Sequence, residues 1–126
     1  MTKHLEMYKC EVCGNIVQVM NEGFGELVCC NKPMTLLKPH SKDEEKMEKH
    51  VPYFTEDNKI QIGSELHPAT IEHHIDFIQT VTDDKMRVIT TFLHPTEEPV
   101  SKNYETDEHY KAYEYCNIHG LWVNEK

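Results

Sequence analysis

The sequence has little positive charge and no long apolar run, and these shortages exclude several classes of protein. Its 126 residues hold 13 Lys and Arg against 22 Asp and Glu, a formal net charge of −9. This balance argues against a phosphate-backbone partner, so we expect no nucleic-acid binding. No apolar run approaches the roughly 20 residues of a membrane-spanning helix, and the N-terminus lacks a signal-peptide core. We therefore expect a cytoplasmic protein without membrane contact.

Helical periodicity is also almost absent. Beyond residue 50 the apolar residues recur in short runs with a period of two, which is typical of strands. The expected strands cover residues 51–54, 59–63, 75–81, 86–93, 110–115 and 120–123. Short strands separated by turn signals favour a mainly β chain with an all-β sandwich.

The third of these runs carries a prediction about its two faces. Ile75, Phe77 and Val81 are expected on one face, and Ile78 on the other. The acidic pair at 83–84 suggests a hairpin turn to the next strand.

The N-terminal part of the chain is short of large apolar residues but rich in cysteine. Residues 1–36 contain Cys10, Cys13, Cys29 and Cys30, and such a stretch needs a metal to fold. Residues 37–46 are polar and read as a linker and exposed loop. We expect a metal-stapled module over 1–36 and a β-sandwich domain over 37–126. The spacing does not choose between iron and zinc, and a disulfide between Cys29 and Cys30 is the alternative.

The cysteine spacing also predicts local geometry. In a C-x-x-C turn, backbone N–H groups can point at the sulfur of Cys10 and help to keep it ionised. Side chains of neighbouring residues point to opposite sides of extended backbone. Cys29 and Cys30 can therefore bind one ion only if the backbone twists locally.

Five further residues form a second candidate site, and they are scattered over the rest of the chain: His50, His67, His73, Cys116 and His119. Structural zinc prefers four ligands in a closed tetrahedron, so this set is a poor zinc site. It suits a redox-active iron with one open position. Four other histidines are expected to be surface or hydrogen-bonded residues: His4, His40, His94 and His109.

The two groups of motifs together resemble the desulfoferrodoxin family of two-iron superoxide reductases. The four cysteines are similar to the desulforedoxin-type module, and the later motifs are similar to the superoxide reductase catalytic domain, in the same order. The resemblance implies one iron bound by four cysteines and a second bound by four histidines and Cys116, and it gives no indication about calcium. It implies an immunoglobulin-like sandwich of seven strands, a homodimer and a rubredoxin-like electron donor.

The resemblance also implies roles for single residues. His50, His67, His73 and His119 would be equatorial ligands and Cys116 the axial one. His74 follows His73 where similar proteins often carry an aromatic residue, so the ligand could be displaced by one position. The six-residue step from His67 selects His73.

Glu48 and Lys49 directly precede His50 within a charged run that could be an ordinary solvated loop. A cation beside a metal ligand would attract an anionic substrate and stabilise developing negative charge. The resemblance implies that Lys49 assists superoxide binding and protonation, and that Glu48 occupies the sixth position of the resting ferric site.

The expected activity is therefore the one-electron reduction of superoxide to hydrogen peroxide, with an external electron donor. Two alternatives stay open. A rubredoxin-like electron carrier would use only the four-cysteine iron and leave the five-residue set without a role. A structural zinc protein would not explain five ligands.

Overall fold

The computed structural model describes residues 1–41 and 50–126, and these contain strands but no α-helix. The mainly β fold class is thus confirmed. The chain divides into two compact units, Met1–Lys38 and Pro39–Lys126, whereas the sequence placed the boundary after residue 36. Among the described residues, no helix is long and apolar enough to cross a membrane.

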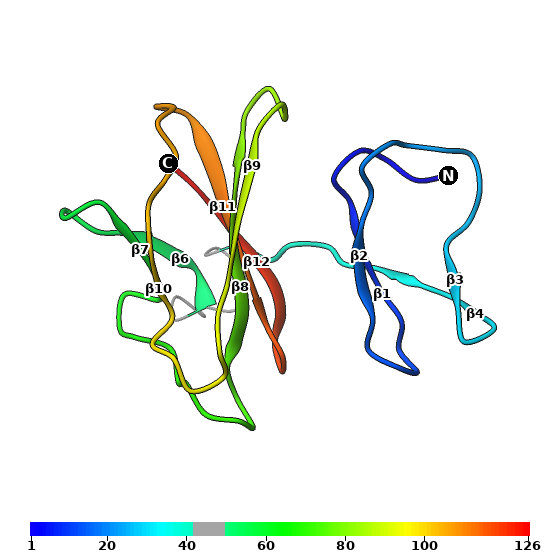
Figure 1. Cartoon of the computed structure of the whole chain (residues 1–126), viewed down its shortest axis with the longest axis horizontal. Coiled ribbons are helices and arrows are strands. Elements are labelled where there is room, and N and C mark those ends of the chain that lie inside the picture. Colours follow the sequence, from blue (N-terminus) through cyan, green and yellow to red (C-terminus); the bar gives the residue numbers. More distant parts are fainter. Residues whose placement is uncertain (42–49) are drawn as a thin grey trace. The chain divides into compact units, whose positions relative to one another are not determined.

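The first unit consists of a small sheet and a separate hairpin. Strand β1 (Met7–Lys9) lies between β2 (Ile16–Gln18) and β5 (Thr35–Leu36), antiparallel to both. Strands β3 (Val28–Cys29) and β4 (Lys32–Pro33) form the hairpin (Figure 1).

The core of this unit is sparse. Its buried hydrophobic residues are Met7, Cys10 and Val19, whereas Met20 and Phe24 are 74% and 92% exposed. So little apolar burial agrees with the expectation that a bound metal holds the unit together.

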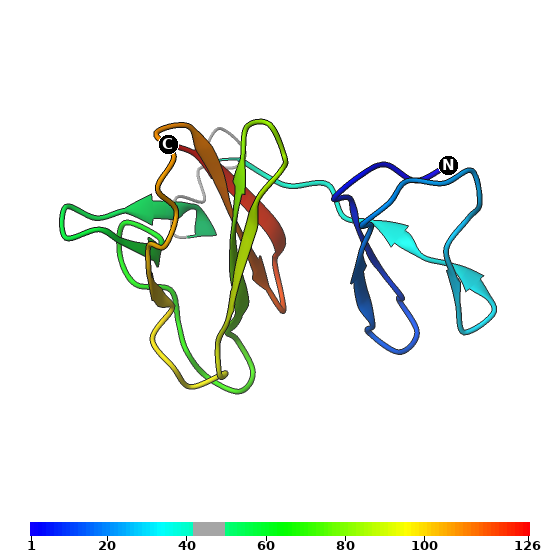
Figure 2. The same cartoon turned by 45° about the horizontal axis from the view of Figure 1, so that its top comes forward.

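The second unit is a sandwich of two antiparallel sheets (Figures 1 and 2). One sheet has the order β10 (Val100–Lys102), β7 (Lys59–Ile62), β6 (Pro52–Phe54), and the other has the order β12 (Gly120–Glu125), β11 (Tyr110–Cys116), β8 (Ile75–Thr82), β9 (Val88–Phe92). The described residues of this unit thus form seven strands. The residue pattern missed β10, which is only three residues long and follows two glutamates and a proline.

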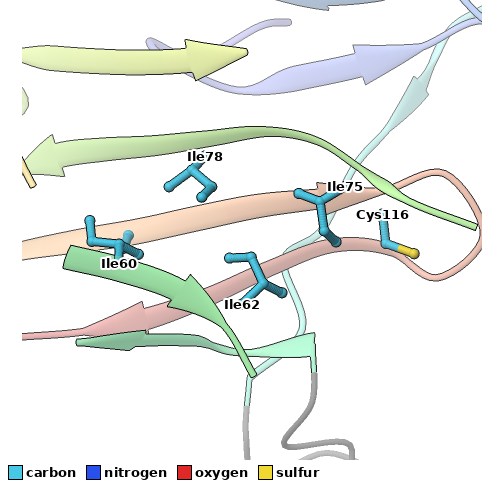
Figure 3. Close-up of a cluster of buried hydrophobic side chains, with 6 residues drawn as sticks. Ile60, Ile62, Ile75, Ile78 and Cys116 are labelled. Atoms are coloured by element: carbon cyan, nitrogen blue, oxygen red, sulfur yellow. The ribbon is translucent and has the colours of Figure 1, made fainter. Parts of the chain in front are cut away.

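The core between the sheets is mostly isoleucine. Ile60 and Ile62 of β7 face Ile78 of β8 and Ala112 of β11, and all four are at most 2% exposed. Cys116 lies at one end of this cluster, beside the turn from β11 to β12 (Figure 3). The packing that stabilises the sandwich therefore also fixes the backbone position of this cysteine.

One prediction about β8 was wrong. Ile75 packs in the same core cluster as Ile78, although they were expected on opposite faces. The pairing with β11 shifts register here, because Tyr115 opposes Phe77 while Cys116 opposes Ile75. An irregularity of this kind adds one residue, Asp76, and turns the preceding side chain to the other face.

Two connecting segments complete the fold. The turn expected at 83–84 joins β8 to β9. Lys85 adopts a positive φ of 61° in this turn, a value that glycine adopts more readily. Residues 37–41 are more than a linker. His40 forms a parallel bridge with Trp122, its N–H donating to Leu121 and its carbonyl accepting from Val123.

Candidate metal sites

The first candidate site is the four-cysteine cluster of the N-terminal unit. The Sγ atoms of Cys10, Cys13, Cys29 and Cys30 all lie within 4.8 Å of one another. Cys10 and Cys13 belong to the turn between β1 and β2, and the other two belong to the β3–β4 hairpin. Two turns far apart in the sequence thus converge on one point.

The first turn directs backbone hydrogen atoms at sulfur, as its spacing predicted. The Cys13 N–H donates to Cys10 Sγ at 3.4 Å, and Gly14 closes the turn with a φ of 86°. This backbone hydrogen bond is the main reason why the pKa of the Cys10 thiol is lowered to about 6. A thiol of this kind is largely ionised at neutral pH and ready to bind a metal.

The second turn provides the local twist that adjacent cysteines need. Cys30 and Asn31 have φ of 53° and 62°, the positive values that a type I′ hairpin turn requires at its two central residues. All five cysteines are free, and Cys29 Sγ lies 4.0 Å from Cys30 Sγ. The alternative of a Cys29–Cys30 disulfide is therefore wrong.

Four sulfur atoms this close cannot all be ionised without a cation. Hydrogen bonds with Cys10 and Cys13 raise the pKa of Cys29, and the same neighbours raise the pKa of Cys30 to about 12. A bound divalent or trivalent metal removes this conflict, because it neutralises the thiolates that it coordinates. The donor set fits a tetrahedral zinc or iron ion.

The second candidate site lies in the sandwich unit. Ligand atoms of His50, His67, Cys116 and His119 lie within 4.8 Å of one another, and the first three residues are buried. His50 lies two residues before the start of β6, His67 follows β7, and the other two flank the β11–β12 turn. Residues of both sheets therefore meet at one end of the sandwich.

The rings of this cluster present particular nitrogens to its centre. His67 Nδ1 lies 2.8 Å from the Pro68 carbonyl, so Nδ1 carries the proton and Nε2 is the nitrogen facing Cys116 Sγ, at 3.6 Å. His119 presents Nδ1 at 3.7 Å from the same sulfur. A carbonyl that fixes the tautomer in this way is typical of metal-binding histidines.

His73 lies beside this group but is not one of its four members. Its ring centroid is 4.5 Å from that of His67 and 5.0 Å from that of His119. The neighbouring His74 is engaged elsewhere: its Nδ1 contacts the Thr70 carbonyl at 3.0 Å, and its Nε2 lies 3.0 Å from Asp76 Oδ1. The ring contacts favour His73 over His74.

Cys116 has a strongly buried sulfur. Burial raises the pKa of this thiol, although N–H groups of Ile118 and His119 lower it in part. The His119 N–H donates to Cys116 Sγ at 3.4 Å. A buried thiol becomes a thiolate here when a metal ion supplies the opposing charge, as it does for coordinating cysteines in general.

Three residues around the site were missed by sequence reasoning. The Trp122 ring stacks on His50 with centroids 5.2 Å apart, and its Nε1–H donates to the His119 carbonyl at 3.1 Å. Asn117 links this turn to the His73 segment through side-chain hydrogen bonds with the backbone of Glu72 and His74. The third, Glu114, is fully buried with no hydrogen-bond partner among the described residues, and burial raises its pKa well above the ordinary value. Its place two residues before Cys116, on the same face of a strand, was the available signal.

The other predicted site residues divide into two groups. Glu48 and Lys49 lie outside the described residues, so their roles stay predictions. The histidines that were expected to have no metal are all exposed: His4, His40, His94 and His109.

A small cysteine module followed by a β-sandwich with a histidine–cysteine cluster defines a class of metalloproteins with two metal sites. Comparison of the sequence with models of known protein families identifies the family. The model of the desulfoferrodoxin N-terminal domain matches residues 2–37, and the desulfoferrodoxin model matches residues 42–125. The chain belongs to the desulfoferrodoxin family. Desulfoferrodoxin of Desulfarculus baarsii is 44% identical over 128 residues, covering 99% of each chain.

Solved structures agree with the fold. The superoxide reductase of Treponema pallidum superposes with a TM-score of 0.72 at 22% identity, covering 98% of this chain and 99% of its own. The superoxide reductase (1Fe-SOR) of Giardia intestinalis has a TM-score of 0.50 at 31% identity and covers 63% of this chain and 97% of its own.

Proposed function

We propose that this chain is a superoxide reductase that carries two iron ions, one in each candidate site. The observation that carries the proposal is the cluster of His50, His67, Cys116 and His119, whose ligand atoms lie within 4.8 Å of one another. Membership of the desulfoferrodoxin family supports it, as does the likeness to the Giardia intestinalis superoxide reductase at 31% identity.

The second site offers nitrogen and sulfur donors that suit iron. Together with His73, the three clustered histidines offer four imidazoles, which suit iron, and Cys116 adds a thiolate. When bound, ferrous iron supplies the one electron that, with two protons, converts superoxide into hydrogen peroxide. A Cys116 thiolate bound to this iron would donate electron density to it, as thiolate ligands do in haem proteins.

The proposal also assigns roles to Glu48 and Lys49, the charged pair that precedes His50 in the sequence. We assign to Lys49 the attraction of the superoxide anion, because the rest of the protein is strongly negative. Its ammonium group would also help to deliver a proton to the reduced product. Glu48 would occupy the open position in the oxidised resting state.

An external one-electron donor must restore the ferrous state, and we propose a rubredoxin-like protein for this role. Each turnover consumes one donor electron, one superoxide and two protons. We further propose a homodimer and a cytoplasmic location. The electron-carrier alternative uses the four-cysteine site alone and gives no role to the buried cluster of the larger unit.

Metal analysis joined to a superoxide-consumption assay tests the proposal. We expect two irons per chain, a visible thiolate-to-iron band from each site, and bleaching of one band by superoxide. Peroxide should form in equal amount to the superoxide consumed, without oxygen release. Oxygen release would indicate dismutation instead, and a colourless protein with two zinc ions would contradict the proposal.

A further inference from the structure

Asn117 connects the two segments that carry ligands of the second site. Its Oδ1 accepts a hydrogen bond from the His74 N–H at 2.8 Å, and its Nδ2 donates to the Glu72 carbonyl at 3.0 Å. Its backbone N–H donates to the His74 carbonyl at 3.2 Å. These bonds tie the residues on both sides of His73 to the turn that follows Cys116.

The His73 segment needs such a connection because it lies outside any strand. Residues 67–74 form an irregular stretch between β7 and β8. Thr70 closes this stretch locally, since its Oγ1 accepts from the His73 N–H at 3.0 Å and its N–H donates to the His73 carbonyl at 3.0 Å. These bonds shape the segment, but they do not set its distance from the Cys116 turn.

The pairing of β8 with β11 brings the His73 segment and the turn after Cys116 close together, but it does not extend to His73 itself. The ladder between β8 and β11 ends at the pair Ile75 and Cys116. Asn117 is the next residue, and its side chain extends the connection across the gap to Glu72, which lies on the far side of His73.

The residue type matters as much as its place. A planar amide offers one acceptor oxygen and a donor nitrogen at fixed separation, and both are used here. Alanine offers neither group, and aspartate offers only acceptors. At position 117, only an amide of this length makes both observed bonds.

We propose that Asn117 is a positioning residue that holds His73 at the second iron site and so sets the affinity of that site for iron. The inference rests on two parts of the proposed function, the binding of iron in the second site and the assignment of His73 as one of its ligands. Residues that orient a metal ligand from outside the coordination sphere typically change metal affinity about 10–100-fold when they are replaced.

The test is a chelator competition on the full-length, iron-loaded protein, followed through the visible band of the Cys116 thiolate. We expect Asn117→Ala to weaken iron binding at this site about 10–100-fold and to shift the band, because one imidazole is displaced. The four-cysteine band should not change. Asn117→Asp keeps the acceptor for the His74 N–H, so it should show a smaller loss, and it replaces the alanine variant if that variant does not fold.

Asn103 provides a matched control in the same unit. Its buried amide also makes one bond of each kind, donating to Tyr110 Oη and accepting from the Glu105 N–H. Asn103→Ala should lower the thermal stability and leave the iron affinity and band position unchanged. Equal iron affinity and an unshifted band in both Asn117 variants would overturn the proposal. Because iron binding is measured without superoxide, a wild-type protein that binds both irons but does not reduce superoxide would refute only the proposed function.

Discussion

Cys116 is the residue with the most specific chemical role in the proposed mechanism. Serine has nearly the same size, but the pKa of its hydroxyl is far above that of a thiol, so the group stays protonated and donates little charge to iron. We expect Cys116→Ser to abolish superoxide reduction, measured by pulse radiolysis or a steady superoxide source. The visible band of the four-cysteine iron should persist as an internal control for folding, and retained activity would refute the assignment of Cys116 as an iron ligand.

Replacement of Lys49 tests whether one positive charge speeds the reaction with superoxide in a chain of net charge −9. We expect Lys49→Ala to slow the bimolecular reaction with superoxide by about 10-fold or more and to weaken its dependence on ionic strength, because electrostatic attraction is lost. Lys111→Ala is the matched control. It removes the same charge from a half-buried residue that pairs with Glu125, and it should leave the rate constant nearly unchanged. Equal rates for the two variants would remove Lys49 from the mechanism.

At the residue scale, the sequence pattern indicated the candidate ligands, but it did not indicate the residues that contact them. Cys10 and Cys13 are found by spacing, because a C-x-x-C turn is local. Trp122 and Asn117 act through contacts with His50 and Glu72, which lie far away in the chain. Nothing in a single sequence shows such contacts before the strands are paired.

Among the structural elements, the loop between β10 and β11 depends on one buried carboxylate. Glu105 accepts hydrogen bonds from the Arg87 guanidinium of the β8–β9 connection and from the N–H groups of Thr106 and Asp107. Its side chain is fully buried in the ion pair with Arg87. We expect Glu105→Gln to lower the free energy of unfolding by about 1–3 kcal/mol at pH 7, because charge-assisted bonds are lost, as measured by urea denaturation.

The same loop gives a dependence on pH. The hydrogen bond with Arg87 is the main reason why the pKa of Glu105 is below its usual value. A carboxylate of this kind contributes stability above the pKa of the unfolded chain, about 4.3, and loses it as the pH falls through the lower folded pKa. The stability difference between wild type and Glu105→Gln should therefore shrink in acid. A constant difference from pH 7 to acid would contradict the role of the charge.

The elements themselves were predictable where alternation is regular. Six of the seven sandwich strands lie where the apolar pattern placed them, but β10 (Val100–Lys102) has too few residues to show a period. The face of Ile75 was mispredicted because the register shift beside Asp76 depends on how β8 pairs with β11. Alternation along one strand contains no information about its partner.

The whole molecule is built from two units that are stabilised in different ways. The unit Pro39–Lys126 has its own apolar core, centred on Ile60, Ile62 and Ile78, whereas the unit Met1–Lys38 buries few apolar residues and contains the cysteine cluster. The sequence indicates this contrast, because residues 1–36 contain few large apolar residues, whereas apolar residues recur with a period of two beyond residue 50. Loss of the first metal should therefore affect one unit only.

Cys13→Ser tests this independence in the full chain. Removing one of four thiolates should release the first iron and destabilise the N-terminal unit, because the apolar core there is too small to replace the metal. The second site draws every proposed ligand from the other unit, so its visible band and the rate of superoxide reduction should be largely kept. Cys116→Ser is the reciprocal control, since it should lose activity and keep the first iron. If Cys13→Ser instead abolished reduction under a steady supply of electrons while the second band persisted, the two sites would not be independent, and the four-cysteine iron would be an obligatory relay for electrons from the donor.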